Sequence, residues 1–197
     1  MSKSLDFYFD FGSPTAYLAH KRLQQLQEQY ALQVTYKPML LGGVFKATGN
    51  TSPVAIPAKG AYMAEYDLPR FAKRYGVQLK FNPHFPINTL TLMRAAIAAQ
   101  RLGCFDHYVN AVYDAVWNQE KNMGELAVVT DTLNGEGLDA TSLLTLAGDS
   151  QVKAELIANT EAAVERGCFG TPTLFMDDQM FFGQDRLDFV EEALQAS

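Results

Sequence analysis

One serine in this sequence stands where a strand gives way to a helix, a position suited to chemistry on a thiol. Residues 5–11 alternate aromatic and acidic side chains, which is typical of a buried strand, and Gly12, Ser13 and Pro14 follow at once. Glycine permits a sharp turn and proline suits the first helical turn, so Ser13 is the expected N-cap. The N–H groups and partial positive charge of a helix N-terminus can stabilise a thiolate.

A second candidate feature is the loop that contains Thr171 and Pro172, just before a short apolar strand. A cis Thr171–Pro172 bond would turn the Thr171 backbone outward, where an extended peptide could pair with it. Neither feature is specific by itself. Serine is a common helix cap, and only about one X–Pro bond in twenty is cis.

Four further polar residues lie where they could reach a small polar ligand. Gln184 and Asp185 follow the last expected strand, so Asp185 could bind an ammonium group while nearby N–H groups receive a carboxylate. Capping of the last helix explains Asp185 equally well. Asn50 and Lys59 lie in a Gly- and Pro-rich segment, where a lone lysine is ordinarily a solvated residue.

The elements around these residues follow the order strand, helix, strand, several helices, hairpin, helix. A helix from Ser13 to about residue 30 links the first strand to a parallel second strand, residues 34–38. We expect a long loop over residues 42–59 and helices from residue 62 to about 166. The hairpin of residues 173–182 has no sheet of its own, so it must join the N-terminal strands.

Composition narrows the classes of partner. The chain has 197 residues, 48% of them hydrophobic, and a formal net charge of −6, which disfavours nucleic acid and anionic membranes. No apolar run reaches membrane-spanning length, and the N-terminus lacks a signal-peptide pattern, so we expect a cytoplasmic protein. Cys104 and Cys168 form no Cys-X-X-Cys pair, and the histidines lack metal-ligand spacing, so we predict no metal site.

Seven motifs in this order resemble one known family over essentially the whole chain. The sequence is similar to the 2-hydroxychromene-2-carboxylate isomerases, which belong with kappa-class glutathione transferases in the DsbA-like group. The motifs are FDFGSPTAY (9–17), KPMLLGGVF (37–45), GN (49–50), PAK (57–59), FP-x-NT (85–89), GTPT (170–173) and FGQDRLD (182–188).

The resemblance implies an α/β, thioredoxin-like fold with an all-helical insertion domain. Residues 1–40 would form the first part of the thioredoxin-like domain, as strand, helix and strand. Residues 41–167 would form the loop and helical insertion domain. Residues 168–197 would complete the thioredoxin-like domain with a hairpin and a helix.

The resemblance also implies glutathione as cofactor, with Ser13 as the catalytic residue at the thiol. The positions that would bind glutathione are Asn50, Lys59, Thr171, Pro172, Gln184 and Asp185, and the resemblance predicts that the Thr171–Pro172 bond is cis. In the implied reaction, the thiolate adds to the conjugated ring system of 2-hydroxychromene-2-carboxylate and the ring opens. A former double bond then rotates, and the thiolate leaves to give trans-o-hydroxybenzylidenepyruvate, so glutathione is regenerated.

Two other functions fit the same motifs. A kappa-class transferase or peroxidase would consume glutathione, and a non-catalytic peptide binder would use the Pro172 loop without glutathione. A dithiol oxidoreductase is disfavoured, because Ser13 and Ala16 occupy the positions of its two cysteines. By analogy with relatives we expect a homodimer that acts on a small aromatic or conjugated substrate.

Overall fold

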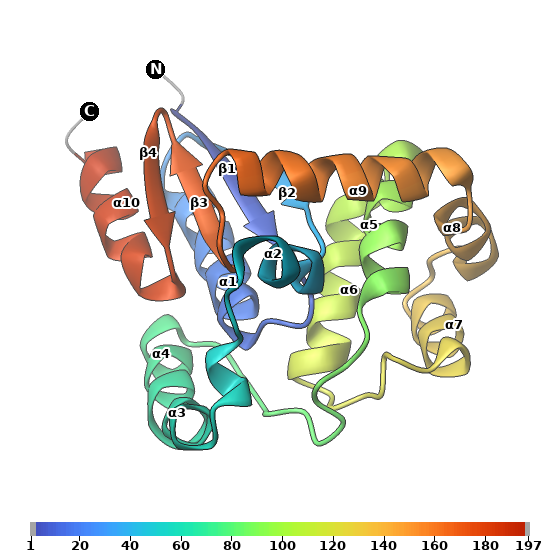
Figure 1. Ribbon diagram of the computed structural model, residues 1–197, viewed down its shortest axis with the longest axis horizontal. Coiled ribbons are helices and arrows are strands. Elements are labelled where there is room, and N and C mark those ends of the chain that lie inside the picture. The colour runs from blue at the N-terminus through green and yellow to red at the C-terminus, as the bar shows by residue number, and fades with distance from the viewer. Residues whose placement is uncertain (1–2, 196–197) are drawn as a thin grey trace.

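A four-stranded mixed sheet forms the centre of the fold in the computed structural model, which describes residues 3–195 (Figure 1). β1 (Lys3–Phe9) lies between the parallel strand β2 (Leu32–Pro38) and the antiparallel strand β3 (Thr173–Met176). β4 (Gln179–Phe182) pairs with β3 at the sheet edge. Both ends of the chain therefore build one sheet, which confirms the predicted α/β thioredoxin-like fold; the domain boundaries stay a prediction.

Alternating side chains of β1 supply two separate cores. Leu5, Phe7 and Phe9 are fully buried on the side of α1 (Pro14–Gln29) and α10 (Leu187–Gln195). Tyr8 points to the opposite face, where it packs with residues of α2 and α9. This period of two is the alternation that the sequence shows in residues 5–11. In Figure 1, α9 crosses the sheet and α2 lies below it, close to the C-terminal end of β1.

Every described element between β2 and β3 is helical, as we predicted for most of this segment. Short helical turns at Pro53–Ala55 and Met63–Asp67 flank α3. The helices are α2 (Leu41–Thr48), α3 (Pro57–Tyr62), α4 (Leu68–Tyr75), α5 (Leu90–Leu102), α6 (Phe105–Trp117), α7 (Leu126–Gly135), α8 (Ala140–Ala147) and α9 (Ser150–Glu165).

The predicted loop over residues 42–59 is wrong, because α2 and α3 occupy most of it. Tertiary packing overrides the low helix propensity of Gly42 and Gly43 here. Val44 is fully buried against the second core. A Cβ atom at Gly43 would lie only 3.0 Å from Cγ2 of Thr160, so glycine allows α2 to approach α9 closely.

Three further observations concern membranes, metals and disulfides. Within residues 3–195, none of the helices combines the length and the apolar character needed to cross a bilayer. The same residues contain no cluster of three or more His, Cys, Asp or Glu side chains suited to a metal ion. Cys104 and Cys168 are both free thiols.

A buried histidine joins α1 to β2 and α6. Nδ1 of His20 lies 2.7 Å from the Tyr36 hydroxyl, and Nε2 lies 3.0 Å from Oδ1 of Asn110. The imidazole also stacks on Tyr113, with ring centroids 5.0 Å apart. Burial lowers the pKa of His20 to about 4, so the ring is neutral in the folded protein at neutral pH.

We therefore predict that the fold loses stability as the pH falls from about 6.5, the unfolded pKa of histidine, towards 4. Below 6.5 the unfolded chain binds a proton that the folded chain excludes. The loss should approach about 1.4 kcal/mol per pH unit in this window. Urea unfolding followed by circular dichroism at several pH values measures it. His20→Phe should lose this pH slope, whereas His107→Gln, on the surface, should keep it. Parallel pH profiles for wild type and His20→Phe would contradict the assignment.

Candidate active site

All seven residues singled out in the sequence line one cavity of about 630 Å³. The cavity lies between the start of α1, the segment that carries α2 and α3, and the loops that precede β3 and follow β4. These loops approach one another at the end of the sheet nearest α3 and α4 (Figure 1). The residues are Ser13, Asn50, Lys59, Thr171, Pro172, Gln184 and Asp185.

Ser13 is the N-cap of α1, as predicted, and its hydroxyl is the central polar group of the cavity wall. Its Oγ accepts a hydrogen bond from the Ala16 N–H at 3.1 Å. It also lies 2.9 Å from Oγ1 of Thr15 and donates to the Thr171 carbonyl at 3.3 Å. A hydroxyl carries one proton, so only one of these acceptors can be served at a time, and a ligand atom can compete for it.

The Thr171–Pro172 peptide bond is cis, as predicted. The loop is held by three hydrogen bonds: Thr171 Oγ1 donates to the Tyr8 carbonyl (3.0 Å), Thr173 Oγ1 to that of Gly170 (2.8 Å), and the Gly183 N–H to that of Pro172 (3.0 Å). The Thr171 carbonyl faces the start of α1, where Ser13 donates to it. The backbone beside the serine is thus fixed by its neighbours rather than by a ligand.

Asn50 and Lys59 differ in whether their side chains already have hydrogen-bond partners in the protein. The Asn50 side chain donates to the Phe169 carbonyl at 2.7 Å and accepts from the Thr51 N–H at 2.8 Å. It therefore ties the end of α2 to the loop before the cis-proline. The Lys59 ammonium, on α3, is exposed and has no hydrogen-bond or ion-pair partner within residues 3–195. Lys59 is accordingly available to an anionic group.

Gln184 and Asp185 lie in a 3₁₀ turn, Gln184–Arg186, that precedes α10. The expectation that Asp185 caps the last helix is wrong, because this turn separates it from the start of α10 at Leu187. Its carboxylate instead pairs with Arg186 at 2.5 Å. The Gln184 carbonyl accepts from the Tyr75 hydroxyl at 2.8 Å, which links the turn to α4.

Asp10 is a residue beside the candidate site whose structural role the sequence analysis missed. Its buried carboxylate accepts from the Gly12 N–H at 2.9 Å and from the Leu41 N–H at 2.8 Å. Burial raises the pKa of Asp10, while hydrogen bonds from Leu41, Gly12 and Thr89 act in the opposite direction. Asp10 thereby positions the turn before Ser13. The sequence signal that could have indicated this role is an acidic residue directly after a strand rich in aromatic residues.

Thr15 is the other missed residue. Its hydroxyl lies within hydrogen-bond distance of both Ser13 Oγ, at 2.9 Å, and the Thr171 carbonyl, at 3.4 Å. The first turn of α1 therefore brings two hydroxyl groups to the cavity wall. Nothing in the sequence pattern distinguished Thr15 from an ordinary residue of the first helical turn.

The cavity rim is charged and partly aromatic. Lys59 and Arg186 supply positive charge, and Asp67 and Asp185 supply negative charge. The rings of Phe169 and Phe182 pack with centroids 4.4 Å apart beside the cis-proline loop, and both line the cavity. A cavity with this lining can hold a small zwitterionic peptide at its rim and place a thiol at the start of α1.

Comparisons with known proteins agree with this architecture. Residues 4–195 match the family model described as a DSBA-like thioredoxin domain. The chain is 34% identical to the 2-hydroxychromene-2-carboxylate isomerase of Sphingobium xenophagum, over 98% of this chain and 99% of that protein. It is 26% identical to glutathione S-transferase kappa 1 of Homo sapiens, over 98% and 92%. A solved 2-hydroxychromene-2-carboxylate isomerase superposes with a TM-score of 0.88 at 31% identity, covering 98% and 95%.

We predict that Asp10→Asn destabilises the protein by about 1–3 kcal/mol, because the amide NH₂ must face one of two backbone N–H donors. Asp6→Asn is the matched control on the same strand. Asp6 pairs with Arg166 near the surface, where an ion pair contributes about 0–1 kcal/mol. Chemical denaturation of both variants at neutral pH measures the difference. Equal losses would show that Asp10 does not anchor the Ser13 turn.

Proposed function

This chain belongs to the DSBA-like thioredoxin domain family and, within it, to the group that contains the 2-hydroxychromene-2-carboxylate isomerases and the kappa-class glutathione transferases, and from that premise we propose that it is a glutathione-dependent isomerase. Its proposed substrate is 2-hydroxychromene-2-carboxylate and its proposed product trans-o-hydroxybenzylidenepyruvate. The observation that carries the proposal is the Ser13 hydroxyl at the start of α1, in the wall of a cavity large enough for a tripeptide and a small substrate.

Ser13 is the proposed catalytic residue. Its hydroxyl can turn from the Thr171 carbonyl to donate to a sulfur atom, and the N-terminus of α1 adds partial positive charge at the same point. Both effects favour a thiolate over a thiol and so lower the thiol pKa below its ordinary value of about 8.5. When bound, glutathione supplies a nucleophile that adds reversibly to a conjugated electrophile.

The proposed glutathione contacts follow from charge and backbone geometry. The fixed Thr171 and Pro172 backbone is suited to pair with the cysteinyl unit. Lys59 is suited to a carboxylate because its ammonium has no partner within residues 3–195. Asp185, with Arg186 beside it, is suited to the γ-glutamyl end, which carries both an ammonium and a carboxylate.

The remaining proposed contacts come from Asn50 and Gln184, which line the same cavity. Asn50 already donates one side-chain hydrogen bond to the Phe169 carbonyl, and the second N–H of its amide can serve a ligand. Leu41 and Phe45 on α2, together with Phe85 in the same lining, offer apolar and aromatic surface to a flat conjugated ring. Such a lining suits an aromatic substrate better than a purely aliphatic one.

A second candidate is a kappa-class transferase or peroxidase, favoured by the 26% identity to the human kappa protein. It would use the same cavity and the same Ser13, but it would consume glutathione. Since the relatives are enzymes, the non-catalytic peptide binder is the weakest of the three functions. The cytoplasmic location and the homodimeric state remain proposals by analogy, and gel filtration with light scattering tests the latter.

An assay with purified protein separates the first two functions. We predict that 2-hydroxychromene-2-carboxylate is converted only when glutathione is added, because the chain places serine, not cysteine, at position 13. The free thiol concentration, titrated before and after turnover, should be unchanged. Loss of thiol in proportion to product, or turnover of chlorodinitrobenzene alone, would favour the transferase. Equal rates with and without glutathione would contradict both.

Charge at the rim gives a second test. We predict that Lys59→Met weakens glutathione binding by about 1.5–3 kcal/mol, the usual contribution of a charge-assisted hydrogen bond. The rise in melting temperature with glutathione concentration measures the affinity. Lys46→Met is the matched control, since Lys46 belongs to α2 but lines a different cavity. If both lysine variants and the wild type were protected equally, Lys59 would have no part in binding glutathione.

A further inference from the structure

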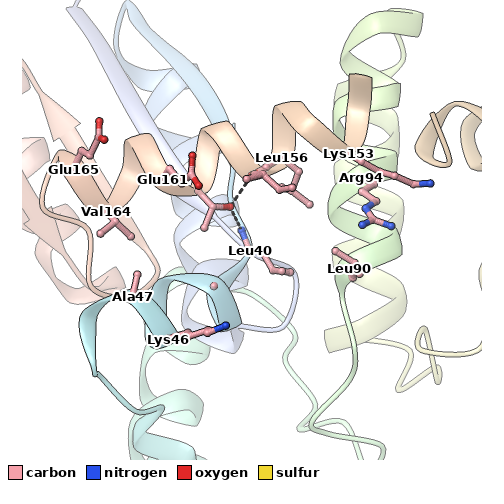
Figure 2. Close-up of a pocket in the computed structure, with 13 residues that line it drawn as sticks. Leu40, Lys46, Ala47, Leu90, Arg94, Lys153, Leu156, Glu161, Val164 and Glu165 are labelled. Carbon is pink, nitrogen blue, oxygen red and sulfur yellow. Dashed lines mark hydrogen bonds between the residues drawn. The ribbon is translucent and has the colours of Figure 1, made fainter. Parts of the chain in front are cut away.

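A second cavity, of about 590 Å³, lies between α2, α5 and α9 (Figure 2). It is distinct from the cavity at Ser13, because the two share no lining residue. Helix α2 separates them: Leu41 and Phe45 line the Ser13 cavity, whereas Gly43 and Ala47 line the second one. Its size falls in the range of small-molecule sites in proteins, and no step of the proposed isomerisation uses it.

The lining is mostly apolar. Leu40 just before α2, Leu90 from α5 and Leu156 from α9 surround the central space in Figure 2. Ile157, also in the lining, is 58% exposed. An apolar hollow that opens to water exposes surface which a hydrophobic ligand body would cover.

Arg94 distinguishes this cavity from a simple packing defect. It projects from α5 into the space beside Leu90, and its Nε atom is buried without a hydrogen-bond partner within residues 3–195. In that part of the chain, Arg94 also forms no ion pair. Arg94 as a whole is half-buried, but its Nε–H has lost its water and gained no acceptor, and an unpaired buried donor of this kind is costly.

The other charged residues of the lining are Lys46 on α2 and Lys153, Glu161 and Glu165 on α9. In Figure 2 the Lys46 side chain points from α2 toward the gap between α2 and Leu90. Glu161 and Glu165 also belong to the lining, but in Figure 2 their carboxylates lie across the α9 ribbon from Lys46. Neither glutamate forms an ion pair with Arg94, so a bound carboxylate would supply a partner that the described residues do not.

We propose that this cavity binds an aromatic monocarboxylate, with the carboxylate on Arg94 and the ring against Leu40, Leu90 and Leu156. The planar guanidinium matches a carboxylate in a bidentate arrangement, and the apolar walls favour a ring over a strongly hydrated polyanion. The site is independent of the Ser13 cavity, so it stands whether or not the proposed isomerase function does.

Calorimetric titration with 2-naphthoate tests the site. The wild type should bind this probe, and the neutral analogue 2-naphthamide should bind about tenfold or more weakly, because it cannot pair with a guanidinium. Arg94→Met should weaken 2-naphthoate binding by a similar factor and leave 2-naphthamide nearly unchanged. Arg101→Met is the matched control on α5, since Arg101 pairs with Glu155 outside the cavity. It should bind both probes like the wild type.

A second variant tests the same site without changing Arg94, in case Arg94→Met does not fold. Ile157→Glu changes an exposed position at the cavity and should weaken 2-naphthoate at least as strongly, by charge repulsion. Near-ultraviolet circular dichroism should show native packing in each variant. The proposal is overturned if 2-naphthoate fails to bind at millimolar concentration. It is also overturned if Arg94→Met and Ile157→Glu both bind 2-naphthoate with wild-type affinity.

Discussion

One buried carboxylate, that of Asp10, fixes the relation between two parts of the wall of the Ser13 cavity. The two oxygens of Asp10 accept from the Gly12 N–H and the Leu41 N–H, so the turn before Ser13 and the start of α2 cannot move independently. A carboxylate that is buried away from water is stable only when hydrogen-bond donors replace the water. Here two backbone N–H groups do so. Ser13, at the end of that turn, thereby acquires its fixed position opposite the Thr171 carbonyl.

Helix α2 connects this arrangement to the rest of the molecule. Its first residue is held by Asp10, and the Leu40 N–H just before it donates to Thr160 on α9 at 3.0 Å. The close approach at Gly43 allows the same helix to serve as a wall of both cavities. A substitution that shifts α2 would therefore affect the Ser13 cavity and the Arg94 cavity together.

Local patterns predicted the features that depend on neighbours in sequence. The Ser13 cap follows from a strand, a glycine and a proline in succession, and the joined sheet follows from a hairpin without a partner. The cis bond before Pro172 required the family resemblance. Long-range contacts explain the errors: Val44 and Thr160 stabilise a helix over glycines, and nothing local reveals that Asp10 reaches Leu41.

The most direct test of the central claim is the pKa of the glutathione thiol in the complex, read from thiolate absorbance in the ultraviolet as pH is varied. The wild type should ionise the bound thiol well below its reference pKa of about 8.5. Ser13→Ala should still bind glutathione but with a higher thiol pKa, because the helix end remains and one donor is lost. The thiol pKa values with Ser13 and with Ser13→Ala should also be compared in protein that carries Thr15→Val, since Thr15 presents a second hydroxyl beside Ser13. An identical thiol pKa with and without the Ser13 hydroxyl in both backgrounds would contradict the account.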